Sequence, residues 1–310
     1  MPLDADQQAL AARVSNWGRW GAEDQRGTLN LLDEAATRRG AAAVRSGRSF
    51  PLAIGVGANG PQTGRIPGRT NPVHTMTAVS FAFTGDPGDF QTSDDKIETG
   101  THTTTHWDAL AHAGYDNLLF NGRSNAVVTE EDGATELGID HFGPIVTRGL
   151  LCDVARLKGV DWFEEPYAIT GADLDACLAE AGLTVAPGDI VLVRTGQIHW
   201  FKQGDNRRYA DISPGIGLDA VEWLQAHDVA AVANDTHVFE PYPCPGANPF
   251  LFPVHLIMLR DVGMPQGQQW DLDALAADCA ADGQYDFLLS ATPIPVTHGC
   301  GGIVAPVATK

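Results

Sequence analysis

Pro187-Gly-Asp-Ile-Val-Leu-Val-Arg-Thr-Gly196 is the stretch that decides the fold class of this 310-residue chain. Its Pro-Gly-Asp opening is typical of a turn. The apolar run that follows, residues 190–194, predicts a strand. Helices and strands can be followed outward from this strand in both directions.

Toward the N-terminus, residues 145–155 predict a buried strand, and Thr170 is expected to cap a helix over residues 173–181. Toward the C-terminus, residues 218–226 predict a helix and residues 229–232 a second buried strand. The other expected elements are helices over 5–14, 30–45 and 271–279, a surface loop over 47–73, and strands over 73–84, 288–294 and 303–307.

Strands and helices alternate over residues 145–305, which predicts an α/β or α+β class. Hydrophobic residues make up 44% of the chain, enough for a sizeable core. No Pro/Ser-rich linker or internal repeat divides the sequence. We therefore expect residues 1–310 to form one domain, with residues 1–95 packed on it as an N-terminal extension.

The composition excludes several classes of partner. A net charge of −19 disfavours nucleic acid and anionic membrane surfaces, because phosphate binding needs clustered Lys and Arg. The first residues lack the apolar segment of a secretory signal, and no run of about 18 apolar residues predicts a membrane span. Five scattered cysteines without a C-x-x-C pair predict reduced thiols in a cytoplasmic protein.

A second stretch carries the chemistry. His102-Thr-Thr-Thr-His106-Trp-Asp108-Ala-Leu-Ala-His112 contains three of the ten histidines within eleven residues. Imidazoles and carboxylates are ligands of divalent metals such as Zn²⁺ and Mn²⁺. Two His and one Asp leave coordination positions open for water or substrate, and the fourth group, His112, is then free to move protons. The alternative interpretation is an ordinary hydrogen-bonded polar turn.

This segment resembles the signature H-x-G-T-H-x-D-x-P-x-H of the Putative cyclase family of metal-dependent hydrolases, which includes bacterial kynurenine formamidase and isatin hydrolase. The three histidines and the aspartate match, while Thr104 stands where the family has Gly and Leu110 where it has Pro. The likeness, closest to the longer members, extends to residues 16–32, 187–196, 214–215 and 233–236. It implies a swivelling β/β/α-type fold, with a mixed central sheet or barrel flanked by helices, and a homodimer or homotetramer.

The resemblance also bears on the number of metals. In two-metal members, a later His and a Glu about a dozen residues on complete a second site. His255 matches the His, but the Glu position falls near Gly267 or Gln268, where no Glu is available. Because Gln is neutral and binds hard cations weakly, we expect one divalent metal, Mn²⁺ or Zn²⁺. The expected ligands are His102, His106 and Asp108, with His255 and Gln268 completing the shell or holding its water.

The expected activity is metal-dependent hydrolysis of an amide, cyclic amide or lactone in a small molecule by activated water. The resemblance gives His112 the role of proton acceptor and donor. Further residues are candidates for contacts with the substrate, although aromatic residues more often belong to the core: Trp107, Tyr115, Phe120 and His237. The alternatives are a metal-binding protein without hydrolytic activity and a metal-dependent lyase or cyclase.

Overall fold

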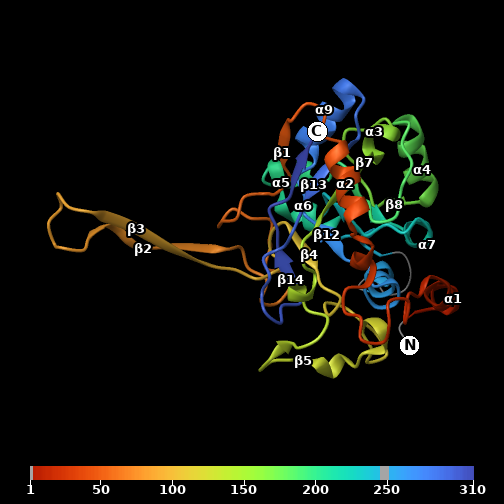
Figure 1. Ribbon diagram of the computed structural model, residues 1–310, viewed down its shortest axis with the longest axis horizontal. Helices are drawn as coiled ribbons and strands as arrows, with labels where there is room; N and C mark the ends of the chain where they lie inside the picture. Colours follow the sequence, from red (N-terminus) through yellow and green to blue (C-terminus); the bar gives the residue numbers. More distant parts are fainter. Residues whose placement is uncertain (1–2, 245–250) are drawn as a thin grey trace.

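The computed structural model of the protein describes residues 3–244 and 251–310. Its centre is a mixed nine-stranded sheet, strongly curled into a half-barrel and flanked by helices (Figure 1). This confirms the predicted fold class. In spatial order the strands are β1 (Ser49–Pro51), β15 (Val307–Thr309), β13 (Asp286–Ser290), β7 (Val146–Asp153), β9 (Ile190–Arg194), β11 (Ala231–Asn234), β12 (Gln266–Gln268), β4 (His106–Asp108) and β14 (Gly301–Ile303).

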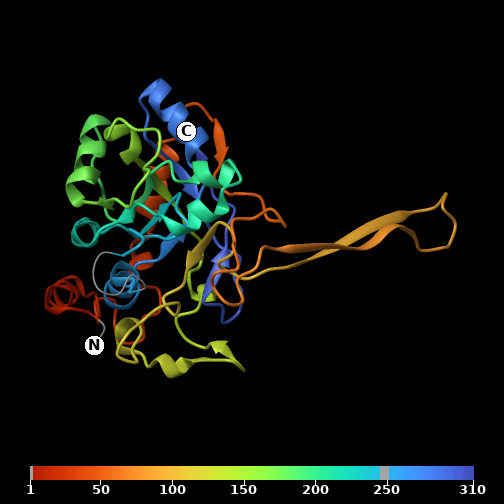
Figure 2. The same ribbon diagram turned by 180° about the vertical axis from the view of Figure 1, so that it is seen from behind.

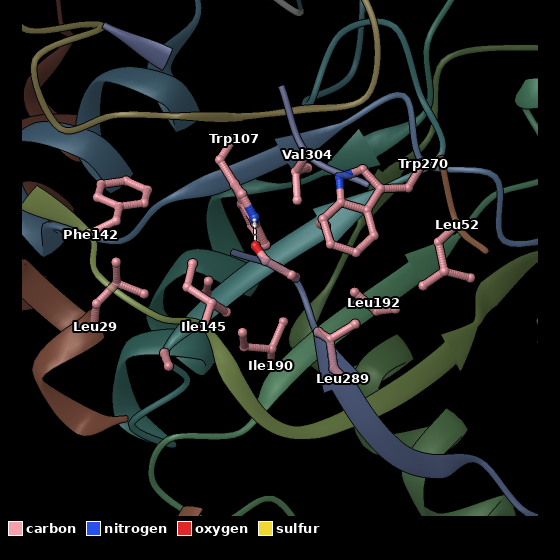
Figure 3. Packing of buried hydrophobic residues seen from close by; sticks show 14 of the residues in the cluster. Leu29, Leu52, Trp107, Phe142, Ile145, Ile190, Leu192, Trp270, Leu289 and Val304 are labelled. Carbon is pink, nitrogen blue, oxygen red and sulfur yellow. Dashed lines mark hydrogen bonds between the residues drawn. The ribbon is translucent and has the colours of Figure 1, made fainter. Parts of the chain in front are cut away.

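Strands β7, β9, β11 and β12 run parallel, and antiparallel neighbours extend the sheet on both sides. Side chains alternate across a strand, so β9 supplies two hydrophobic cores. Ile190 and Leu192 join one cluster, together with residues of α9 (Asp273–Asp282), as Figure 3 shows for part of it. Val191 and Val193 join the other, with residues of α1 (Ala5–Val14), α4 (Gly171–Glu180) and α7 (Leu218–Ala226).

Local sequence signals explain where several helices begin. Thr170 caps α4 as predicted, through a reciprocal pair of hydrogen bonds with Asp173. The predicted helix over 30–45 is instead divided into a 3₁₀ turn, Gly27–Leu31, and α2 (Glu34–Ala42). The division falls where the Asp33 side chain accepts a hydrogen bond from the Ala36 amide, which starts a new helix.

Two strand predictions differ from the structure at their ends. The strand expected over 288–294 stops at Ser290, because its partner residue, Val146, is the first of β7. The strand expected over 303–307 is divided between β14 and β15. The shorter elements are α3 (Val154–Leu157), α5 (Ile198–Lys202), α6 (Asn206–Asp211), α8 (Pro253–Leu256), the π-helical turn Ile257–Val262, the 3₁₀ turns Phe120–Gly122, Asn125–Val127 and Ile139–His141, and the strand pairs β5 (Val128–Thr129) with β6 (Gly133–Ala134) and β8 (Ala168–Ile169) with β10 (Gly215–Ile216).

A long hairpin projects away from the body (Figures 1 and 2). It consists of β2 (Val73–Ala82) and β3 (Gln91–Glu98), paired antiparallel. Three aromatic side chains toward its turn, Phe81, Phe83 and Phe90, are 53%, 67% and 73% exposed. Only the first strand was predicted from the sequence, since the second is almost entirely polar. The predicted homodimer or homotetramer stays a prediction.

The N-terminal region shares the central sheet and core. Residue 49 begins the edge strand β1, and Leu29 and Leu52 belong to the core cluster. A boundary at residue 95 stays a prediction. All five cysteines are free thiols, as expected. In the described ranges, no helix has the length and apolar character needed to cross a bilayer.

Candidate metal centre

Strand β4 positions the centre of the site. Residues two apart in a strand share a face, so His106 and Asp108 point one way and Trp107 the other. Trp107 is fully buried in the hydrophobic core, where its indole donates a hydrogen bond to the Ala291 carbonyl (2.8 Å; Figure 3). The structure therefore places this predicted substrate contact in the core, away from the site face of β4.

One oxygen of the fully buried Asp108 faces three imidazoles. Its Oδ1 lies 3.3 Å from Nε2 of His106, 3.5 Å from Nε2 of His102 and 4.0 Å from Nε2 of His112. Ligand atoms of His102, Asp108 and His112 all lie within 4.8 Å of one another. The structure thus brings together all four residues of the sequence signature.

Neighbouring threonine residues orient two of these rings. Nδ1 of His106 lies 2.6 Å from the Thr104 carbonyl, so Nε2 is the nitrogen left for a ligand. Nδ1 of His102 lies 3.0 Å from the Thr101 hydroxyl. A Cβ atom at Gly301 would lie 2.3 Å from Nε2 of His102, so this position on β14 makes room for the ring. Thr104, which stands where the signature has Gly, avoids the left-handed backbone region that favours glycine.

The other oxygen of Asp108 faces the remaining predicted residues. Gln268, opposite His106 on β12, donates from Nε2 to Oδ2 of Asp108 at 2.8 Å. Nε2 of His255 lies 3.9 Å from the same oxygen. Glu240 Oε1 accepts a hydrogen bond from Nδ1 of His255 at 2.6 Å and another from its backbone amide. The hydrogen bond from Nδ1 orients the ring so that its Nε2 faces the site.

Burial and charge set the protonation states. Burial lowers the pKa of His102 well below its usual range, and the neighbouring His112 lowers it further. Burial also lowers the pKa of His112 to about 4. Burial alone would raise the pKa of Asp108, but His112 and the other two imidazoles hold it well below its usual range. At neutral pH the group therefore contains an ionised carboxylate and neutral His102 and His112 rings.

These residues fit a divalent metal. Within the described part of the chain, His106 Nε2 and Asp108 Oδ1 are buried and make no hydrogen bond, although buried polar atoms are normally paired. Bonds of 2.0–2.1 Å in a tetrahedral zinc site separate neighbouring ligand atoms by about 3.3 Å. The separations of Asp108 Oδ1 from His106 and His102 are close to that value. Nitrogen and oxygen donors without thiolate suit Zn²⁺ and Mn²⁺.

A cavity of about 370 Å³ opens beside these histidines and Asp108. Its lining includes His112, His255 and Gln268, and also His237, the fourth predicted substrate contact. A second cavity of about 210 Å³ shares Ile66, His237, Val238 and Phe252 with the first. Both have largely apolar walls, as is usual for small-molecule sites.

Two predicted substrate contacts do not reach these cavities. Phe120 is buried in the core, against Gly263. The hydroxyl of Tyr115 donates to Oδ2 of Asp261 at 2.9 Å, and its ring stacks on the Arg260 guanidinium. Neither residue lines either cavity.

Two site residues were missed by sequence reasoning. Glu240 lies fifteen residues before its partner His255, so no local spacing connects them. Arg69, which lines the larger cavity, lies in the Gly- and Pro-rich segment that was predicted only as a surface loop. Its single signal was a cationic residue in a strongly acidic chain.

Both the sequence and the fold of this chain are similar to those of known proteins. A profile of the family described as Putative cyclase matches residues 41–241. A crystal structure described as a novel cyclase is 35% identical, with a TM-score of 0.88 over 97% of this chain and 99% of that chain. Isatin hydrolase A from Ralstonia solanacearum is 21% identical, with a TM-score of 0.61 over 84% of this chain and 91% of that chain. No curated protein matches the sequence.

A third solved structure is more distant. It is described as a "predicted metal-dependent hydrolase" from Bacillus stearothermophilus and is 16% identical, with a TM-score of 0.51 over 84% of this chain and 97% of that chain. At these identities the two hydrolase structures show a shared fold, while the novel cyclase shares both sequence and fold with this chain.

Proposed function

The chain belongs to the Putative cyclase family, and from this membership and its His/Asp group we propose that it is a metal-dependent hydrolase of a small molecule. The bond that it cleaves is an amide, a cyclic amide or a lactone. Structural neighbours named isatin hydrolase and metal-dependent hydrolase support this reaction class.

One observation carries the proposal. Two buried polar atoms, His106 Nε2 and Asp108 Oδ1, lack hydrogen bonds within the described chain, and two further imidazoles converge on the same oxygen. Desolvating such atoms without partners costs about 1–3 kcal/mol each, which a bound cation removes. We propose one Mn²⁺ or Zn²⁺, held by His102, His106 and Asp108.

The chemistry divides between the cation and the side chains. When bound, a divalent cation supplies Lewis acidity, which acidifies water and polarises a carbonyl. The ionised Asp108 provides the compensating negative charge. Gln268 donates to Oδ2 of Asp108 and so orients the carboxylate. Glu240 orients His255 beside the same oxygen.

We propose His112 as the group that accepts a proton from water and returns it to the leaving group. Its Nε2 is the furthest of the three from Asp108 Oδ1, and its side chain is 22% exposed, against 11% for His102 and 1% for His106. It also lines the cavity where a substrate would lie. Its unprotonated ring at neutral pH is the form that accepts a proton.

A substrate panel tests the proposal. Protein loaded with Mn²⁺ or Zn²⁺ is assayed with isatin, a formyl anilide and a dienelactone, by the absorbance of the ring-opened or deformylated product. We expect turnover of at least one compound, and its loss after chelation and in Asp108→Asn. Bound metal at one ion per chain without turnover of any carbonyl compound would refute hydrolysis.

A further inference from the structure

Arg69 is placed over the cavity by a closed loop, residues 62–71. The ends of this loop are joined because the Gln62 amide donates to Oδ1 of Asn71 (2.8 Å) and the Asn71 side chain donates back to the Gln62 carbonyl (3.2 Å). The Gln62 side chain also donates to the Thr103 carbonyl at 2.9 Å. The loop that carries Arg69 is thus fixed to the segment that carries His102 and His106.

The Arg69 guanidinium stands out among the arginines of this segment. Arg65, four residues earlier, pairs with Asp211 at 2.6 Å and with the Tyr242 hydroxyl. Within the described ranges, the Arg69 side chain has no hydrogen bond, ion pair or aromatic partner, although it is partly buried and lines the cavity. The carboxylate of Asp108 attracts it only from beyond ion-pair distance. A guanidinium presents donors in a rigid planar fork, so this side chain is prepared for an anion from outside the chain.

His237 provides a second donor beside the same cavity. It is 8% exposed, lines both cavities, and neither ring nitrogen has a partner among the residues described. Burial, together with the positive charge of Arg69, lowers its pKa to about 3. The ring therefore stays neutral beside the guanidinium and keeps one N–H for an acceptor oxygen.

The charge and the walls of the cavity define the ligand class. One unpaired guanidinium matches one negative charge, and its fork matches a carboxylate in a bidentate arrangement. The remaining walls include Ile66, Leu251, Phe252 and Leu256, which suit an apolar body. We propose that Arg69, assisted by His237, is the anion-recognition residue of this cavity, and that the substrate carries a carboxylate on an apolar or aromatic body. This inference rests on the proposed function for the identity of the cavity as the substrate site.

A binding experiment tests the proposal without turnover. The probes are 4-fluorobenzoate and its neutral analogue 4-fluorobenzamide, titrated by ¹⁹F NMR against Zn²⁺-loaded protein and against chelator-treated protein. The chelator-treated sample excludes direct coordination of the carboxylate by metal. Charge-assisted hydrogen bonds correspond to roughly tenfold to hundredfold in affinity. We expect the benzoate to bind at least tenfold more tightly than the amide in both samples.

Matched variants assign the preference to Arg69. Arg69→Met keeps chain length and should abolish the preference, and Arg69→Lys, which keeps the charge but loses the fork, should restore part of it. Arg38→Met removes the same charge from a side chain that is 72% exposed on α2, and should bind like the parent protein. Thermal unfolding of each variant verifies folding.

The outcomes separate this inference from the proposed reaction. Equal affinity for both probes in the parent protein, or an unchanged preference in Arg69→Met, would overturn the assignment. A protein that prefers the benzoate through Arg69 but hydrolyses nothing would refute the hydrolase and keep the carboxylate site. Turnover without any carboxylate preference would do the reverse.

Discussion

Replacing Gly301 by alanine tests how closely the fold holds the His102 ring. A Cβ atom there would lie 2.3 Å from Nε2 and 2.8 Å from two ring carbons, whereas ordinary contacts begin near 3.4 Å. The ring must therefore move by about 1 Å. The backbone has little freedom to move instead, because Gly301 pairs with Asp108 and the neighbouring Cys300 carbonyl accepts from the Ala109 amide at 3.0 Å.

The displacement is large on the scale of a metal site. Ligand distances there are held within about 0.2 Å, so a shift of about 1 Å removes His102 from the proposed ligand set. Loss of correct ligand placement typically lowers metal affinity tenfold to hundredfold, about 1.4–2.8 kcal/mol. Overpacking also costs the metal-free protein about 1–3 kcal/mol of folding stability.

The assay is competition with a chromophoric zinc chelator, with metal content measured after dialysis. Gly55→Ala is the matched control, because a Cβ there meets no atom within 4 Å. In a His102→Ala background, Gly301→Ala should cause no further loss of affinity. Gly301→Ala with the affinity of the parent protein would refute the ligand role of His102, and additive losses would show that the two changes act separately.

Three further predictions address the same region. His112→Ala should abolish turnover and keep the metal, as measured by metal content and activity; loss of the metal would identify His112 as a ligand. Glu240→Gln should weaken metal binding about tenfold or more, because it disturbs the acceptor of the His255 Nδ1 proton; an unchanged chelator competition curve would contradict this. The free energy of unfolding, measured with urea at pH 7 and pH 5, should fall less between these two pH values in His237→Phe than in the parent protein. His237 has a pKa of about 3 in the folded protein and about 6.5 in the unfolded chain, so its contribution to folding stability is complete above pH 6.5 and falls as pH approaches 3. An equal change in the free energy of unfolding in both proteins would contradict the lowered pKa of His237.

Most of the fold could be predicted from strong local patterns in the sequence. The apolar run of β9 and the Thr170 cap of α4 depend on nearby residues, and both were predicted correctly. Strand β3 could not be found in this way, because its polar sequence is paired only with β2 and contacts no core. Strand β12 has three residues, two of them Gln, and exists through its neighbours β11 and β4.

In the candidate site, too, some residues could be predicted from local sequence and others could not. His102, His106, Asp108 and His112 lie within one segment, so their convergence was visible in the sequence. Arg69 and Glu240 meet the site only through tertiary contacts. The position of Trp107 was available from strand alternation, since a residue between His106 and Asp108 in a strand must face away from both.

The β2–β3 hairpin and the body of the protein are expected to differ in local stability. A two-stranded ribbon without a covering layer is marginal in water, and its exposed apolar side chains gain nothing from the body. Its amides are expected to open at close to zero free energy, whereas those of β7 and β9, buried between two cores, open only with the whole domain. In a hydrogen-exchange experiment, the amides of the hairpin should therefore exchange rapidly and those of the central sheet slowly. Slow exchange in the hairpin would therefore indicate that another molecule covers it.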